Sequence, residues 1–172
     1  SDQAGPPADV EPAGVRLLAE PRLPIDRAMP VVVARRPSGS EVVYEPVETV
    51  QADGICREVR LPADVSAEVH DEARRIAGGI AEAIDAVGIL AVELFVCADQ
   101  VVVNELACRP HNSGHITMDA CTTSQFENHL RAVLDLPLGS VEPIAPAAVM
   151  VNLLGGPNGE DPRQRLAGGL AV

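Results

Sequence analysis

The chain has 172 residues, of which 47% are hydrophobic, so it can form one domain with a core and is not a disordered chain. Its formal charge is −12, from 25 acidic and 13 basic residues, and all 13 basic residues are arginines. An acidic chain without a basic cluster binds nucleic acid and anionic membranes poorly, so neither is an expected partner, and bound phosphate must be met by arginine, backbone N–H groups or a divalent metal.

The first half of the chain combines short β-type runs with one long helix. A small, polar lead-in rich in Pro and Gly comes first, over residues 1–14. Pro37-Ser38-Gly39 predicts a hairpin turn between two of the runs. Apolar residues at steps of three and four predict a helix over 65–87, and Gly88 suits its C-terminal stop. The predicted strands of this half are Val15–Ala19, Met29–Arg36, Glu41–Pro46 and Arg57–Leu61.

The second half predicts another hairpin, a loop and a second helix. Strands over 89–96 and 100–106 flank a short polar turn, and a loop rich in Gly and His follows at 108–115. The second helix starts near residues 123–124, and a last β run spans 147–154. The predicted fold class is α+β, a mostly antiparallel sheet covered by helices. The apolar face predicted for the second helix consists of Phe126, Leu130, Val133 and Leu134.

Two glutamates lie on the strands of this second hairpin. The apolar neighbours of Glu93 alternate, so Glu93 points away from them, and Glu105 is expected on the face of Val101 and Val103. A three-residue turn at 98–100 would place Glu93 directly across from Glu105, about 5 Å away. Two facing carboxylates need a raised pKa or a cation between them, and Mg²⁺ accepts one or two carboxylates together with phosphate oxygens. The alternative is that both glutamates are solvated on an exposed face.

The segment RPHNSGH follows the hairpin and is the second cluster of polar residues. Arg109 offers a forked donor for a carboxylate, bicarbonate or phosphate, and His111 can donate a hydrogen bond or move a proton near neutral pH. Asn112 and Ser113 add short polar contacts, and Gly114 allows a close approach of the backbone. The alternative is a plain polar turn with surface histidines.

The four cysteines include no C-x-x-C pair. Together with the absence of a secretory signal and of a run of about 18 apolar residues, this favours reduced thiols in the cytoplasm. A zinc site of Cys108, His111, His115 and Cys121 has suitable ligand types, but its spacing matches no usual structural zinc pattern. The chain starts at Ser1 instead of Met, which suggests a processed or partial chain.

At these motifs the sequence resembles a known family. The stretch from VGILAVELFV through VVVNELACRPHNSGH to TSQFENHLRAVLDLPLG is similar to the ATP-grasp core of N5-carboxyaminoimidazole ribonucleotide synthetases, which are also called the ATPase subunit of phosphoribosylaminoimidazole carboxylase. The resemblance implies that residues 15–156 are the C-terminal part of an ATP-grasp domain, and that the tail at 157–172 leads to a further segment. It also implies a cytoplasmic, homodimeric ligase of purine biosynthesis, in which ATP phosphorylates bicarbonate and aminoimidazole ribonucleotide is then carboxylated.

The resemblance implies a role for each residue that matches the family's motifs. Metal binding by carboxylates, nucleotide binding and the handling of bicarbonate fall on different residues. The implied assignments are Mg²⁺ binding by Glu93 and Glu105, ATP binding near adenine and ribose by Glu20, the handling of bicarbonate and carboxyphosphate by Arg109 and His111, and substrate binding by Asn112 and Ser113.

Three positions depart from the family pattern. Cys108 and Ala28 stand where the family has proline and glutamate, and Pro30 where it often has serine. The chain also has no lysine, although lysines of a separate small subdomain hold the ATP phosphates in the family, so the isolated chain is expected to be inactive. Two alternatives remain open: a formate-dependent glycinamide ribonucleotide transformylase, whose loop continues D-T-G-M instead of NSGH, and a non-catalytic remnant.

Overall fold

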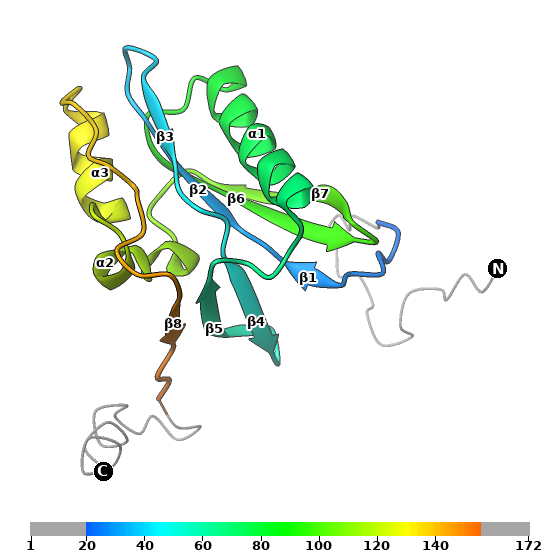
Figure 1. Cartoon of the computed structure of the whole chain (residues 1–172). Helices are drawn as coiled ribbons and strands as arrows, with labels where there is room; N and C mark the ends of the chain where they lie inside the picture. The colour runs from blue at the N-terminus through cyan, green and yellow to red at the C-terminus, as the bar shows by residue number, and fades with distance from the viewer. Residues whose placement is uncertain (1–19, 156–172) are drawn as a thin grey trace, which may run out of the picture.

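The computed structural model of the chain describes residues 20–155 (Figure 1). The lead-in expected at 1–14, the strand expected at 15–19 and the tail at 157–172 lie outside the described residues. Within the described part, eight strands form one sheet in which each pair of neighbours is antiparallel. These strands are β1 (Arg27–Ala28), β2 (Val31–Arg35), β3 (Glu41–Val43), β4 (Glu48–Ala52), β5 (Ile55–Leu61), β6 (Gly88–Cys97), β7 (Gln100–Ala107) and β8 (Ala148–Val151).

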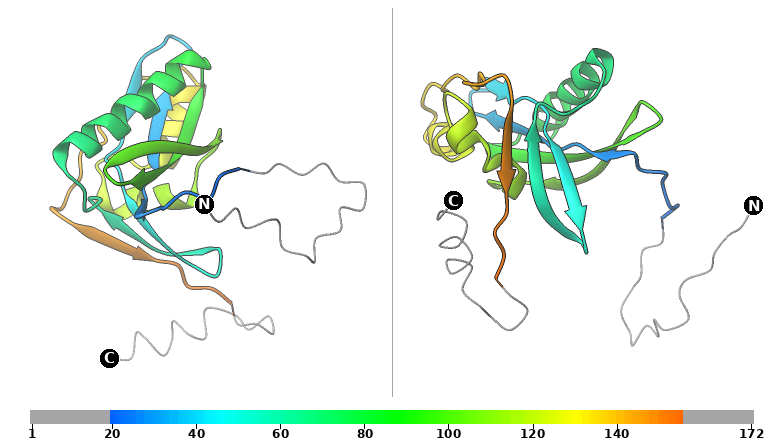
Figure 2. Two further views of the ribbon diagram at one scale, coloured as in Figure 1. Left: turned by 90° about the vertical axis from the view of Figure 1, so that its right-hand side faces the viewer. Right: turned by 60° about the horizontal axis from the view of Figure 1, so that its bottom comes forward.

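Strand β6 lies at the centre of the sheet and carries the candidate site. The sheet order is β3-β2-β6-β1-β4-β5-β8. Strand β7 lies off this path and pairs with the edge of β6 that is opposite to β1 and β2. Most residues of β6 and all of β2 are buried, because helices cover both faces of the sheet. Figure 2 shows α1 (Ala67–Ala83) and α3 (Gln125–Val133) on opposite sides of the sheet. The predicted α+β class with a mostly antiparallel sheet is confirmed.

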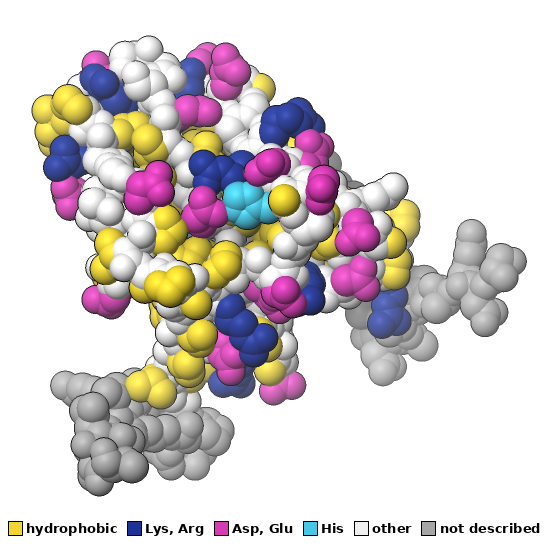
Figure 3. Space-filling model, in the orientation of Figure 1, with side chains coloured by type: hydrophobic (Ala, Val, Ile, Leu, Met, Phe, Trp, Pro, Cys, Tyr) yellow, Lys and Arg dark blue, Asp and Glu magenta, His cyan; other side chains and the backbone are white. Residues whose placement is uncertain are grey.

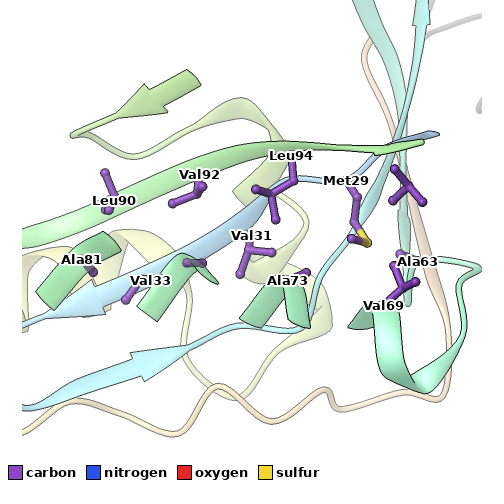
Figure 4. Packing of buried hydrophobic residues seen from close by; sticks show 12 residues of the cluster. Met29, Val31, Val33, Ala63, Val69, Ala73, Ala81, Leu90, Val92 and Leu94 are labelled. Atoms are coloured by element: carbon purple, nitrogen blue, oxygen red, sulfur yellow. The ribbon is translucent and has the colours of Figure 1, made fainter. Parts of the chain in front are cut away.

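Helix α1 covers one face with small and branched side chains (Figure 4). Ala73, Ala77 and Ala81 are fully buried there against β2 and β6, and Ser66 caps the helix by accepting a hydrogen bond from the Val69 N–H at 3.3 Å. The predicted end at residue 87 is wrong. The helix stops four residues earlier, where Asp85 adopts a left-handed conformation at φ 50°.

Helix α3 covers the other face, together with the short helix α2 (Thr117–Ala120) and the 3₁₀ turn η1 (Asn112–Gly114). The predicted apolar stripe is present on α3, but it does not point toward the core. The buried residues are Gln125, Asn128 and Ala132, whereas Leu130 and Leu134 are 60% and 65% exposed. Figure 3 shows hydrophobic side chains at the surface on the side where α3 lies.

The strands of the first half follow the predictions in part. Strand β2 covers 31–35 of the predicted run 29–36, β1 lies just before that run, and β3 is shorter than predicted. The hairpin turn at Pro37-Ser38-Gly39 is confirmed by the pairing of β2 with β3. Strand β4 was not predicted. It pairs with both β1 and β5, and thereby brings Thr49 and Gln51 to the candidate site. In the described part, no helix is long and apolar enough to cross a membrane.

Candidate active site

The hairpin of β6 and β7 brings Glu93 and Glu105 into direct register. The turn has two residues instead of the predicted three, since Cys97 pairs with Gln100. Ala98 and Asp99 both have positive φ angles, 49° and 63°, as in the primed turns that match the twist of an antiparallel hairpin. With this turn alone, Glu93 would pair with residue 104.

A β-bulge corrects the register. Leu94 pairs with Val103 and Glu93 pairs with Glu105, so Asn104 is the extra residue on β7. The bulge moves Glu105 to the face of Glu93, while Val103 lies on the opposite face with Leu94. The expectation that Glu105 shares a face with Val101 and Val103 is therefore wrong, although the predicted pairing of the two glutamates is confirmed. Neither the bulge nor Asn104 was foreseen, and Asn104 donates a hydrogen bond to Glu93 at 3.4 Å.

His111 joins the loop to the hairpin. Its Nε2 lies 3.1 Å from Oε1 of Glu93, and its Nδ1 lies 2.9 Å from Oγ of Ser113. Burial lowers the pKa of His111 below its ordinary value, an effect that the Glu93 carboxylate opposes and the Arg109 guanidinium reinforces. The imidazole is therefore neutral at pH 7. Because a carboxylate only accepts, the contact with Glu93 favours the tautomer with its proton on Nε2, in which the Ser113 hydroxyl donates to Nδ1.

A pocket of about 450 Å³ opens at this contact. It is lined by Glu93, Asn104, His111, Asn112 and Ser113 together with residues of β1, β4 and β5. The structure thus brings together the predicted metal ligand of β6, the predicted catalytic histidine and both predicted substrate-binding residues.

A larger pocket of about 720 Å³ adjoins the first, because both are lined by Phe95 and Asn104. Glu20 lines the larger pocket at the beginning of the described chain. The two pockets form a groove that runs along β6 and β7, from Glu20 at one end to His111 at the other.

Two predicted residues lie beside the pockets without lining them. Glu105 is exposed on β7, and it is close enough to His111 that its charge partly opposes the lowering of the His111 pKa by burial. Arg109 is also exposed, and its guanidinium donates to the backbone carbonyl of Pro110 at 3.0 Å. Its side chain therefore has to turn before it can reach a ligand in the groove.

The alternative zinc site is wrong. Among residues 20–155, no group of three or more His, Cys, Asp or Glu side chains could hold a metal ion. His115 instead stacks on Phe126, with the ring centroids 5.5 Å apart, and Cys108 is exposed. Burial raises the pKa of Cys121 to about 11, so this thiol is protonated at neutral pH.

The residues that depart from the family pattern differ in their distance from the site. Ala28 and Pro30 line the 450 Å³ pocket, so the groove has a smaller and less polar wall at this edge than a glutamate and a serine would give. Cys108 lies outside both pockets.

Comparison with known proteins gives the class of this fold and site. The model of the ATP-grasp domain family matches residues 5–126, and the chain belongs to this family. The chain is also similar to N5-carboxyaminoimidazole ribonucleotide synthases. The synthase of Mycobacterium leprae is 51% identical over 146 residues, which cover 84% of this chain and 33% of the relative.

Solved structures agree with this assignment. The N5-carboxyaminoimidazole ribonucleotide synthetase of Thermus thermophilus is 43% identical, with a TM-score of 0.75, over 78% of this chain and 38% of that one. The Aspergillus clavatus enzyme, in complex with ADP and 5-aminoimidazole ribonucleotide, is 34% identical, with a TM-score of 0.77, over 88% of this chain and 41% of that one. The chain spans about a third of the length of the curated relatives it matches.

Proposed function

We propose that this chain provides the metal- and bicarbonate-binding part of an N5-carboxyaminoimidazole ribonucleotide synthase. The reaction is the ATP-dependent carboxylation of 5-aminoimidazole ribonucleotide with bicarbonate, in the cytoplasmic synthesis of purines. The observation that carries the proposal is the contact of His111 with Glu93 at the 450 Å³ pocket. The relatives named for this reaction add support.

The groove suits an extended nucleotide. We assign the 720 Å³ pocket beside Glu20 to the adenine and ribose of ATP, so that its phosphates extend toward Glu93. Glu93 and Glu105 would hold Mg²⁺, since two adjacent carboxylates and phosphate oxygens are the donor set that this ion prefers. When bound, the ion neutralises charge on the transferring phosphoryl group.

The chemistry proceeds in two steps. A bicarbonate oxygen attacks the γ-phosphorus of ATP, so that ADP leaves and carboxyphosphate forms. The amine nitrogen of aminoimidazole ribonucleotide then attacks the carbonyl carbon, phosphate leaves, and the nitrogen loses one proton. Both steps concentrate negative charge on oxygens, and donors that are already oriented toward such oxygens stabilise the transition state.

The loop supplies those donors. His111 is a neutral imidazole with its proton on Nε2, and Ser113 contacts its other ring nitrogen, so the Nε2–H can donate to a substrate oxygen bound beside Glu93. Asn112 lines the same pocket and adds an amide for substrate binding. Arg109 adds a positive charge once its side chain turns from Pro110 into the groove.

The experiment uses a chimera, in which residues 20–155 replace the matching stretch of the Mycobacterium leprae relative. We expect release of ADP that depends on both bicarbonate and aminoimidazole ribonucleotide. Activity with formate and glycinamide ribonucleotide would instead support the transformylase alternative, and a folded but inactive chimera would support the non-catalytic remnant. The homodimer implied by the family resemblance stays a prediction, which sedimentation of the same chimera checks.

A further inference from the structure

Helix α3 points two side-chain amides into the protein. Gln125 and Asn128 are both fully buried, and each forms a pair of hydrogen bonds with the peptide groups of one loop residue. Oε1 of Gln125 accepts from the His111 N–H at 3.0 Å, and Nε2 donates to the His111 carbonyl at 2.7 Å. Asn128 does the same for Gly139, at 2.8 Å and 3.2 Å. The helix therefore holds two different loops by the same chemistry.

The first of these contacts is reinforced on both sides. The Gln125 N–H donates to Oγ1 of Thr117 at 2.8 Å, and the Thr117 hydroxyl donates to the Gly114 carbonyl at 2.6 Å. A Cβ on Gly114 would lie 2.3 Å from Oε1 of Gln125, so only glycine leaves room for the amide. The loop is thus bound to the start of α3 at residues 111 and 114.

The orientation of the His111 imidazole follows from the position of its peptide. With N–H and C=O both fixed by Gln125, the side chain leaves the loop toward β6, where Nε2 meets Glu93 and Nδ1 meets Ser113. We propose that Gln125 is a positioning residue, which holds the loop so that His111 and Ser113 face Glu93. It acts through the His111 peptide and does not line the pocket that contains Glu93.

Glutamine suits this role because its amide donates and accepts at the same time. Methionine has a similar length but offers neither group, so Gln125→Met leaves two buried peptide groups of His111 without partners. Asn128→Leu is the matched control. It removes an equivalent pair of hydrogen bonds from the same face of the same helix, but at Gly139, together with a hydrogen bond to the Tyr44 hydroxyl. Neither Gly139 nor Tyr44 lines either pocket of the candidate site.

The first measurement uses the purified 172-residue chain and is independent of any catalytic activity. NMR signals of the imidazole nitrogens report the contact of His111 with Glu93, and amide hydrogen exchange reports the His111 N–H. We expect both to change toward the values of an exposed histidine in Gln125→Met and to stay as in the parent in Asn128→Leu. Should Gln125→Met fail to fold, Gln125→Glu replaces it, because it keeps the acceptor for the N–H and loses the donor to the carbonyl.

The second measurement uses the chimera with the Mycobacterium leprae relative and rests on the proposed function. At saturating Mg–ATP, the carboxylation rate should fall on the order of tenfold to a hundredfold in Gln125→Met, since displacing a reacting group by about 1 Å has such an effect. The rate in Asn128→Leu should stay within about threefold of the parent, although both variants unfold at lower temperature.

Three results would overturn the proposal. They are an unchanged His111 signal in Gln125→Met, an equal change of that signal in Asn128→Leu, and an equal fall of the carboxylation rate in both variants. An inactive parent chimera would contradict the proposed function alone. In that case the NMR comparison still decides whether Gln125 positions His111.

Discussion

The apolar side chains of helix α3 face the solvent, and this orientation leads to a prediction about stability. In the purified chain, Leu130→Ala should change the free energy of unfolding by less than about 0.5 kcal/mol, because this side chain is 60% exposed. A leucine of the core would lose about 2–5 kcal/mol in the same substitution. Asn128→Ala should be far more costly, since it removes the bonds to Gly139 and the 2.8 Å hydrogen bond to the Tyr44 hydroxyl. At about 1 kcal/mol for each bond, the loss is about 3 kcal/mol.

Thermal unfolding followed by circular dichroism measures both effects. With about 2–4 °C for each kcal/mol in a domain of this size, Asn128→Ala should lower the melting temperature by about 6–12 °C, and Leu130→Ala by less than about 2 °C. Urea midpoints check the same order. If Leu130→Ala were as destabilising as Asn128→Ala, the apolar stripe would face the core and the described orientation of α3 would be wrong.

Three further predictions concern the site. The isolated 172-residue chain should bind Mg–ATP weakly and show no bicarbonate-dependent ATPase activity, since it has no lysine for the phosphates; steady ADP release would contradict this. In the chimera, Arg109→Ala should lower the carboxylation rate on the order of a hundredfold, equivalent to about 3 kcal/mol of transition-state stabilisation, with little change in Mg–ATP affinity. Glu105→Gln should instead weaken Mg–ATP binding itself. Equal losses of Mg–ATP affinity in both variants would refute this division of roles. Burial lowers the pKa of His111 in the folded chain below 6.5, so the unfolded chain takes up the proton at a higher pH than the folded chain does. The free energy of unfolding should therefore fall as the pH drops below about 6.5. The urea midpoint should fall less over this pH range in His111→Gln.

The sequence predicts the pairing of Glu93 with Glu105 correctly, but the three-residue turn on which this prediction rests is wrong. Alternation along β6 identifies the face of Glu93, whereas the register depends on the turn and on bulges. The two-residue turn and the bulge at Asn104 each shift the pairing by one position and cancel. A bulge at an asparagine has no clear pattern in one sequence, so Asn104 could not be identified as a neighbour of Glu93.

The orientation of α3 shows a different limit of periodicity. The spacing of Phe126, Leu130 and Val133 correctly places them on one face of a helix, but periodicity does not say which face is inward. Here the inward face carries two amides, because the loops at His111 and Gly139 need partners for their peptide groups. The polar first position of the helix and the glycine in RPHNSGH were the available signals, and neither by itself points to Gln125.

Strand β4 was missed for a simpler reason. Its sequence, ETVQA, is short and mostly polar, and three of its residues are only half-buried. Its existence follows from pairing with β1 and β5, which are distant contacts that local patterns do not contain.

The central claim is that Glu93 and Glu105 hold a divalent metal next to His111. The most direct test is paramagnetic broadening of backbone amide signals when Mn²⁺ and ADP are added to the isotopically labelled chain. We expect the signals of Glu93, Glu105 and His111 to broaden first, and a double variant with Glu93→Gln and Glu105→Gln to lose this effect. Broadening spread over other acidic surfaces, or unchanged in the double variant, would show that these two glutamates do not hold the ion.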